Sequence, residues 1–366
     1  MQTNFGASSP YTVGIEEEFQ LVDAESFGLT PVIDAVLATR DDAGLPASSV
    51  TSELSASCLE VRSPVCNTVA ELATELVTSR RKVRELVEGC GARLVAAGTH
   101  PFSDAISQPI TGDERYLRVV KEMGWTARMQ AIYGLHIHVA VPDEEMAIRT
   151  MNTLSRHVPL FVALSTNSPF WGGIDTRLSS ARVKVFGLVP RSGLPPRFRS
   201  WEDFEGYVDT LVASKSIPNF SWCWWDVRPH PDLGTVELRA PDAQTEAART
   251  ASLAALVQCI VATTDKLSHE DPLFTEENKW RATRDGLDAQ LYDFSACEHT
   301  AARDMAHSLV ESLRPVSQEL GCEAELEGVL DIAKSGTGAE KQRAVFAEGN
   351  STKDVARYLV AATADA

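Results

Sequence analysis

The sequence lacks the features that define disulfide-rich, zinc-knuckle and membrane proteins. Its 7 cysteines are scattered singly and no Cys-x-x-Cys pair occurs, which argues against a disulfide framework and a zinc knuckle. No apolar run approaches the roughly 20 residues that a membrane-spanning helix needs. The first ten residues contain no basic segment followed by an apolar one. We therefore expect no secretory signal, no membrane partner, and a reducing cytoplasm as the compartment.

Positive charge is scarce, and so are the common nucleotide-binding motifs. The chain has 34 Lys+Arg against 51 Asp+Glu, for a formal net charge of −17. Such a surface repels phosphate backbones, so we expect no nucleic-acid partner. Neither GxxxxGK[ST] nor a GxGxxG that opens a helix after a strand is present, so a bound nucleotide would use neither a P-loop nor a Rossmann loop. The segment SGTGAEK at 335–341 instead predicts a helix start.

What the sequence does contain is typical of a globular α+β protein. Its 366 residues are 44% hydrophobic and 23% charged, which is enough apolar side chain to build a core. Residues 10–244 are rich in strand patterns, and residues 245–362 have almost continuous helical periodicity. We predict one catalytic domain over 1–366, in which helices pack on a mainly antiparallel sheet and the last third is helical.

Local patterns place the expected elements. Capping residues predict helices that begin after Thr68, Asp143, Ser200, Thr275 and Ser351. The segment 166–196 is rich in Gly, Pro, Ser and Arg, which predicts a long functional loop. Alternating or β-rich patterns predict strands over 12–23, 54–61, 93–97, 134–141, 221–228 and 234–240.

The most informative strand pattern is GIEEEFQLVD, Gly14–Asp23. Side chains alternate between the faces of a strand, so Glu16 and Glu18 share one face, while Glu17 falls on the apolar face. Two carboxylates on one face repel each other unless a positive charge lies between them. A divalent cation that prefers oxygen ligands would provide it. The alternative is an acidic strand that simply faces solvent.

Three further strands also pair an apolar face with a polar one. The residues that share each polar face are His136 with His138, Glu237 with Arg239, and Glu60 with Arg62, and Glu53 lies just upstream of the last pair. A sheet face lined in this way is typical of the floor of an active site. Cations and guanidinium groups together neutralise the charge on a phosphoryl group in transfer, so the pattern predicts metal-assisted phosphoryl chemistry.

Six motifs together resemble the glutamate–cysteine ligase type 2 family of bacterial carboxylate–amine ligases. They occur in order and span most of the chain: GIEEEFQLVD, ELSASCLEVRSPV, GLHIHVAVPD, LSTNSPFWGGIDTRLSSAR, WWDVRPHPDLGTVELRAPDAQ and EENKWRATRDGLDA. The resemblance implies a glutamine-synthetase-like antiparallel half-barrel. It also implies a ligase that uses ATP with Mg²⁺ or Mn²⁺ and joins glutamate, or a similar acid, to an amine such as cysteine through an acyl phosphate. A homodimer is the expected assembly.

The resemblance also implies roles for particular residues. The implied metal ligands are Glu16, Glu18, Glu53, Glu60, His138 and Glu237. Arg239 and Glu237 are the implied catalytic residues, and His136 and Arg239 are expected to contact ATP. Arg182 and Arg228 are expected to bind the acid, with Arg177 and Arg191 as competitors for that role. An ion pair with Asp226 is the alternative role for Arg228.

Two other interpretations of the pattern stay open. His-x-His on a strand also occurs in metal-dependent hydrolases with an amidohydrolase-type barrel, which would need regular alternation of strands and helices. A ligase-like protein could also use a different acid or amine, or bind without catalysis. Departures from the family pattern at Gly173 and at Ala240-Pro241 lie near the expected substrate positions. They leave the identity of the acid and the amine open.

Overall fold

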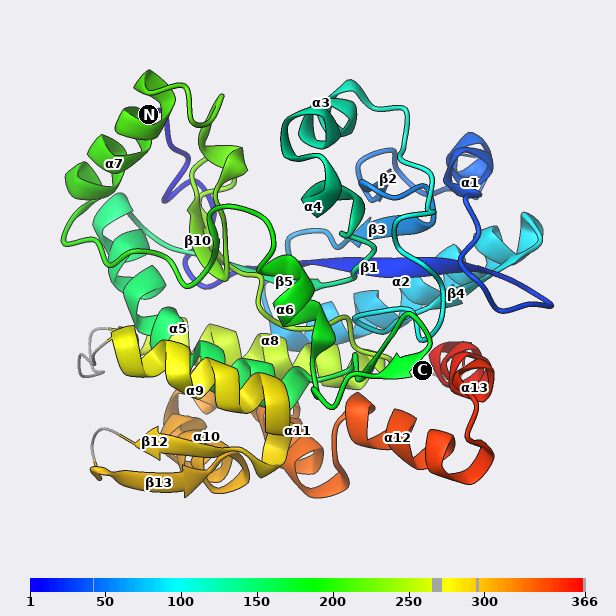
Figure 1. Ribbon diagram of the computed structural model, residues 1–366. Coiled ribbons are helices and arrows are strands. Elements are labelled where there is room, and N and C mark those ends of the chain that lie inside the picture. Colours follow the sequence, from blue (N-terminus) through cyan, green and yellow to red (C-terminus); the bar gives the residue numbers. More distant parts are fainter. Residues whose placement is uncertain (42, 265–271, 294–295, 365–366) are drawn as a thin grey trace.

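A seven-stranded sheet organises the computed structural model, which describes residues 1–41, 43–264, 272–293 and 296–364 (Figure 1). The strand order is β10-β11-β5-β1-β3-β2, with β4 also paired to β1, and every pairing is antiparallel. The strands are β1 (Val13–Asp23), β2 (Val50–Ser52), β3 (Cys58–Arg62), β4 (Ala92–Val95), β5 (Leu135–Ala140), β10 (Val227–His230) and β11 (Thr235–Leu238). The predicted α+β class and antiparallel sheet are confirmed.

Helices follow the strands along the whole chain. In the first part these are α1 (Ile33–Thr39), α2 (Val69–Gly89), α3 (Glu114–Met123), α4 (Trp125–Arg128), α5 (Glu144–Ser165), α6 (Ala181–Phe186) and α7 (Trp201–Ala213). In the last third they are α8 (Ala247–Ala262), α9 (Pro272–Asp285), α10 (Ala302–Leu320), α11 (Glu323–Ser335), α12 (Gly338–Gly349) and α13 (Thr352–Ala364). The helical C-terminal third is therefore confirmed.

Four of the five predicted helix starts are confirmed by hydrogen bonds at the caps. Thr68, Asp143, Ser200 and Ser351 each accept a bond from a backbone N–H in the first turn of α2, α5, α7 and α13. The predicted cap at Thr275 is wrong, because this residue lies inside α9, which begins at Pro272. Proline suits the first turn of a helix because its missing N–H would have no partner there. The predicted helix start in 335–341 is confirmed by α12.

Three other expectations need correction. The predicted loop 166–196 contains α6, whose N-cap Ser180 accepts from the backbone of Val183, and three two-residue strands, β6 (Phe170–Trp171), β7 (Ile174–Asp175) and β8 (Ser192–Gly193). The predicted strand 221–228 is broken into a 3₁₀ turn (Phe220–Trp222), β9 (Trp224–Trp225) and the start of β10. A hairpin of β12 (Gln290–Asp293) and β13 (Glu298–Ala301) interrupts the C-terminal helices.

The two faces of the sheet have different neighbours. The apolar face packs on α5 and α8, and residues such as Ile15, Ile137 and Leu238 lie in one core cluster with both helices. In Figure 1, α2 lies on one side of β1, while α3 and α4 lie on the other. The polar face of the sheet is thus free of the helical core and available for a site.

Glu17 is the buried carboxylate of β1 on the apolar face, and it is fully paired there. Arg80 of α2 donates from Nε and Nη2 to its two carboxylate oxygens, at 3.0 and 2.6 Å, and Thr250 donates at 2.8 Å. Both charged side chains are buried. This pair fixes α2 and α8 against the back of the strand that carries Glu16 and Glu18.

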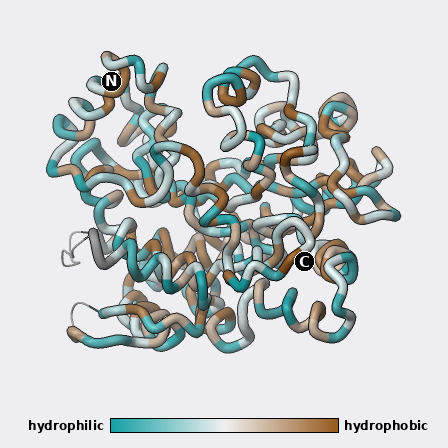
Figure 2. The backbone as a smooth tube through the Cα atoms, in the orientation of Figure 1, coloured by the Kyte–Doolittle hydropathy of each residue, from teal (hydrophilic) through white to brown (hydrophobic). Residues whose placement is uncertain are grey.

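Hydrophobic and hydrophilic stretches alternate along the chain (Figure 2). Among the described residues, no helix is both long and apolar enough to cross a bilayer.

Candidate active site

The register of the sheet brings the predicted polar residues side by side. Glu16 in β1 lies opposite Arg62 of β3 on one side and His136 of β5 on the other. His138 lies opposite Glu237 of β11. Directly opposed residues of an antiparallel pair point to the same face, so four strands contribute to one polar surface.

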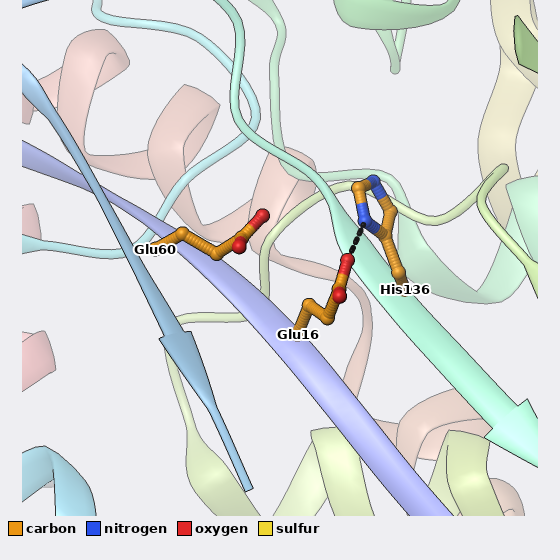
Figure 3. A group of neighbouring side chains, drawn as sticks. All are labelled: Glu16, Glu60 and His136. Carbon is orange, nitrogen blue, oxygen red and sulfur yellow. Dashed lines mark hydrogen bonds and ion pairs between the residues drawn. The ribbon is translucent and has the colours of Figure 1, made fainter. Parts of the chain in front are cut away.

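Two overlapping groups on this surface have the chemistry of metal ligands. Glu16, Glu60 and His136 form one group, and Glu16, His138 and Glu237 form the other. Within each group the candidate ligand atoms all lie within 4.8 Å of one another. Figure 3 shows the first group, in which Oε2 of Glu16 lies 3.1 Å from Nδ1 of His136. Glu16 belongs to both groups and therefore lies at the centre of the surface.

Glu237 is the most strongly charge-stabilised carboxylate of the site. Its side chain is 0% exposed, Arg228 donates from Nε to its Oε2 at 2.6 Å, and Arg239 donates to its Oε1. Burial alone would raise the pKa of Glu237, but the two guanidinium groups hold it well below its usual value. This residue therefore stays ionised and can act as a permanent anionic ligand.

Three other carboxylates lie in the site without enough positive charge: Glu60 is buried, and Glu18 and Glu53 are half-buried. Burial raises the pKa of Glu18. Burial also raises the pKa of Glu53, and the charge of Glu18 adds to that effect. Glu60 has a pKa well above its usual value, because of burial and then of the charges of Glu53 and Glu16. Acids that repel one another in a partly desolvated site are stabilised by added positive charge.

A divalent cation fits this donor set. Carboxylate oxygens with one or two imidazole nitrogens suit Mg²⁺ or Mn²⁺. Nε2 of His138 is buried and has no hydrogen-bond partner, although Oε1 of Glu237 lies 3.9 Å away. Its other ring nitrogen lies 3.0 Å from Oγ1 of Thr235, which fixes the orientation of the ring. An unsatisfied imidazole nitrogen beside an ionised carboxylate is what a metal site requires.

The polar surface lies between two cavities. The larger chamber, of about 590 Å³, lies at the Glu16 and His138 end, and its polar lining includes Ser49, Arg62, Lys82 and Thr235. The smaller chamber, of about 140 Å³, lies at the Glu18 and His136 end, and its charged lining is Glu18, Glu53, Arg182 and Arg239. Glu16 and His136 are directly paired across β1 and β5, and they lie at the boundary, since Glu16 lines the larger chamber and His136 the smaller one. The candidate ligands therefore separate the two chambers.

Of the arginines predicted to bind an acid, only Arg182 lines the smaller chamber. Arg228 does not line it and contacts Glu237 and the carbonyl of Cys223. The alternative ion pair between Arg228 and Asp226 is wrong, because Asp226 pairs with Lys279 at 2.6 Å. Arg177 is exposed, and Nε of Arg191 donates to the carbonyl of Trp222.

Sequence patterns missed the residues that hold Arg182 in place. Its Nη1 and Nη2 donate to the carbonyls of Ala240 and Arg239, at 3.0 and 3.1 Å. A Cβ atom on Gly134 would lie 2.2 Å from Nη2, so glycine is required for this packing. Asp242, whose Oδ1 is 4.0 Å from Nη1 of Arg182, lies four residues beyond the end of β11, where alternation no longer assigns a face. The one sequence signal for Asp242 was its place in WWDVRPHPDLGTVELRAPDAQ, a motif on which the family resemblance rests.

The fold and the sequence agree with one family. A profile of the Glutamate-cysteine ligase family 2 matches residues 12–360. A protein of Rubrobacter xylanophilus, provisionally named glutamate–cysteine ligase 2-3, is 64% identical over 364 residues and the alignment covers 100% of both chains. A second protein of that organism, provisionally named glutamate–cysteine ligase 2-1, is 44% identical over 97% of this chain and 96% of its own.

Solved structures agree on the fold. The glutamate–cysteine ligase of Francisella tularensis, solved in complex with AMP, matches with a TM-score of 0.72 at 13% identity, over 98% of this chain and 90% of its own. A bifunctional glutathione synthetase from Pasteurella multocida also has a TM-score of 0.72, at 16% identity, over 97% of this chain and 52% of its own. With the family profile and the relatives above, these observations place the chain in glutamate–cysteine ligase family 2.

Proposed function

We propose that this protein is an ATP- and divalent-cation-dependent ligase that joins the side-chain carboxylate of glutamate, or of a similar acid, to an amine. The observation that carries the proposal is the position of the candidate ligands between two chambers of different size. Pockets for drug-sized ligands have volumes of roughly 300–1,000 Å³; the larger chamber is within this range, and the smaller one has room only for a smaller molecule. The larger chamber suits a nucleotide and the smaller one a small acid.

The charged side chains also support a nucleotide in the larger chamber and an acid in the smaller one. Lys82 lines the larger chamber and offers positive charge to phosphates, while Arg62, which also lines it, is paired with Glu60 and Glu16. Glu16, Glu60, His136, His138 and Glu237 would hold the cation, which supplies charge neutralisation and orientation for the phosphoryl group. Arg239 lines the smaller chamber beside Glu237 and can place a guanidinium on the phosphoryl oxygens. Arg182 can hold a carboxylate of the acid.

The proposed reaction has two steps. A carboxylate oxygen of the acid attacks the γ-phosphorus of ATP, and the bond to the β,γ-bridging oxygen breaks, so ADP leaves with that electron pair. The amine nitrogen then attacks the carbonyl carbon of the acyl phosphate. A C–N bond forms, the C–O bond to phosphate breaks, and the departing phosphate takes the surplus proton of the nitrogen.

The experiment is an ADP-release assay with purified protein, glutamate, ATP and MgCl₂, and a panel of amines. Hydroxylamine replaces the amine in a parallel assay, because it traps an acyl phosphate as a hydroxamate. We expect ADP and hydroxamate to form only when acid, nucleotide and cation are all present. Formation of ADP without hydroxamate would contradict the acyl phosphate, and the absence of both products would contradict the ligase.

The hydrolase alternative is not favoured by the fold. An amidohydrolase-type barrel requires parallel strands that alternate with helices, whereas all pairings of the seven-stranded sheet are antiparallel. A hydrolase would cleave amides without nucleotide, so the same assay without ATP separates the two activities.

A further inference from the structure

One of the six family motifs has no part in the proposed reaction. EENKWRATRDGLDA (276–289) forms most of α9 and the turn after it, and none of the described residues that line either chamber comes from it. Its Lys279 is nevertheless only 6% exposed, and Nζ donates to Oδ2 of the buried Asp226 at 2.6 Å. A buried ammonium is costly unless it is paired. The ion pair therefore joins α9 to the segment that leads into β10.

The backbone of Asp226 connects three segments. Asp226 lies between β9 and β10, its N–H donates to the carbonyl of Gly193 in β8 at 2.8 Å, and its carbonyl accepts from the N–H of Arg239 at 2.7 Å. Arg239 directly follows β11, and its guanidinium donates to Glu237. Asp226 therefore holds the backbone of the residue whose guanidinium lies at the proposed phosphoryl position.

Hydrogen bonds extend from Arg239 to the second guanidinium of the smaller chamber. Nη2 of Arg182 donates to the carbonyl of Arg239 at 3.1 Å, and Nη1 donates to the carbonyl of Ala240 at 3.0 Å. One chain of polar contacts therefore runs from α9 through Asp226 and Arg239 to the chamber. Its first member, Lys279, is the only one of these residues that lies on α9.

A separate cavity of about 200 Å³ lies behind this chain, with walls from α6 and α9. Arg182, Asp226 and Lys279 are among the residues that line it. Since the cavity adjoins both members of the ion pair, close packing is incomplete around them. The ionic contact itself is then what holds Asp226 against α9.

We propose that Lys279 is a positioning residue for phosphoryl transfer, which acts through Asp226 on Arg239. This inference rests on the proposed function and adds a residue to it. Lys279 lies outside both chambers and contacts neither substrate. A guanidinium stabilises developing charge only when it is already in place, and a displacement of about 1 Å can cost roughly 100-fold in rate. Release of Asp226 from α9 therefore slows the reaction.

The test replaces Lys279 by methionine, which keeps a long side chain and removes the charge. In the ADP-release assay with glutamate, hydroxylamine and MgCl₂, we expect kcat of Lys279→Met to fall at least tenfold. KM for ATP should change less than twofold, because Asp226, Arg239 and Lys279 do not line the larger chamber. A smaller fall in kcat, or a rise in KM for ATP alone, would overturn the proposal.

Two further variants separate loss of position from loss of stability. Lys279→Met leaves the carboxylate of Asp226 buried without its partner, whereas Asp226→Asn/Lys279→Met removes both charges. We expect the double variant to resist urea better than Lys279→Met, while its kcat stays at least tenfold below that of the parent protein. The reason is that α9 still does not hold residue 226.

Lys279→Arg keeps the cation and should keep kcat within threefold of the parent value. If Lys279→Met does not fold, the double variant and Lys279→Arg provide the comparison. Recovery of kcat in the double variant would show that Lys279 acts only through stability. That result, or an equal loss of kcat in Lys279→Arg and Lys279→Met, would overturn the proposal.

Lys341→Met is the matched control. Lys341 of α12 pairs with Glu246, the residue before α8, and neither residue lines a chamber. The same substitution therefore breaks an ion pair between two elements outside the candidate site, and kcat should not change. An equal fall of kcat in Lys341→Met and Lys279→Met would overturn the proposal.

Failure of this inference can be told apart from failure of the proposed function. If the parent protein forms hydroxamate and Lys279→Met forms it at the same rate, the inference is wrong and the ligase stands. If the parent protein forms neither hydroxamate nor ADP, both are wrong.

Discussion

Nη1 of Arg182 lies 4.0 Å from Oδ1 of Asp242, and both side chains are buried. The carboxylate is itself fixed, since it accepts from Oγ of Ser168 at 2.7 Å, Oγ of Ser180 at 2.8 Å and the backbone of Asn167 at 2.8 Å. A Cβ atom on Gly98 would lie 2.6 Å from its Cγ, so the site has no spare room. Burial raises the pKa of Asp242, while Arg182 and these hydrogen bonds oppose that effect. The carboxylate lies directly behind the guanidinium that lines the smaller chamber.

The first prediction is that Asp242→Asn weakens binding of the acid more than it slows turnover. The neutral amide no longer attracts the guanidinium, so Arg182 loses part of its orientation. The pair is a charge contact at 4.0 Å and not a hydrogen bond, so we expect a rise of about tenfold in KM for glutamate, or ~1.4 kcal/mol. Steady-state kinetics with the acid as the varied substrate measure the change.

The matched control is Glu17→Gln, which makes the same chemical change in a buried carboxylate on the opposite face of the sheet. It should lower stability and leave KM for glutamate unchanged. If Asp242→Asn lowers kcat alone, or if both variants raise KM equally, Asp242 does not act through Arg182.

The second prediction concerns the buried pair of Glu17 and Arg80. Arg80→Met leaves the carboxylate buried with only Thr250 as a donor. Removal of one partner of a buried ion pair costs about 3–5 kcal/mol, so we expect the free energy of unfolding in urea to fall by that amount. The double variant Glu17→Met/Arg80→Met should lose less than the single one. A double variant that is less stable than Arg80→Met would contradict this account.

Strand alternation predicted the polar face because the pattern repeats locally in each strand. Glu16 with Glu18 and His136 with His138 needed no information beyond a period of two. Glu17 violated the pattern and looked unexplained. Its partner Arg80 could have been found, since it falls in the apolar stripe of α2 with Leu72, Leu76 and Val83.

Residues outside regular elements were harder to place, because no periodicity assigns them a direction. Asp242 lies four residues beyond the end of β11, so its side chain is positioned by tertiary contacts alone. The two chambers could not be predicted either, since each is lined by segments far apart in the sequence. The family resemblance was enough to predict the fold. The side chains that line the two chambers depend on tertiary packing, which the resemblance did not predict.

The third prediction tests the candidate metal ligands by removing one of them. Glu237→Gln keeps the shape of the side chain and removes a charge from the second ligand group. A cation that binds only the folded state stabilises it by about 2.7 kcal/mol at a hundred times its Kd. We therefore expect MgCl₂ to raise the Tm of the parent protein and to raise that of the variant much less.

ADP formation should be lost in Glu237→Gln while far-UV circular dichroism stays unchanged. Glu298→Gln, at an exposed position of β13, is the control and should respond to MgCl₂ like the parent protein. If MgCl₂ raised the Tm of Glu237→Gln as much as that of the parent protein, the assignment of Glu237 as a metal ligand would be refuted.

The last prediction concerns the pH dependence of stability and rests on His100, away from the candidate ligands. The imidazole is 2% exposed, its Nε2 lies 2.8 Å from the carbonyl of Phe27, and its Nδ1 accepts from the backbone of Ser103. Burial lowers the pKa of His100 to about 4. In the unfolded chain the imidazole of His100 has its ordinary pKa near 6.5. As the pH falls, it is therefore protonated in the unfolded chain before it is protonated in the folded protein.

His100 therefore contributes its full stability above pH 6.5 and loses it as the pH falls from 6.5 toward 4. Between pH 7 and pH 5 the loss is about 2 kcal/mol. The variant His100→Asn keeps an acceptor near the position of Nδ1 and cannot take up a proton. Between pH 7 and pH 5 the free energy of unfolding in urea should fall by about 2 kcal/mol less for the variant than for the parent protein. Equal declines would show that His100 is not protonated on unfolding in this range.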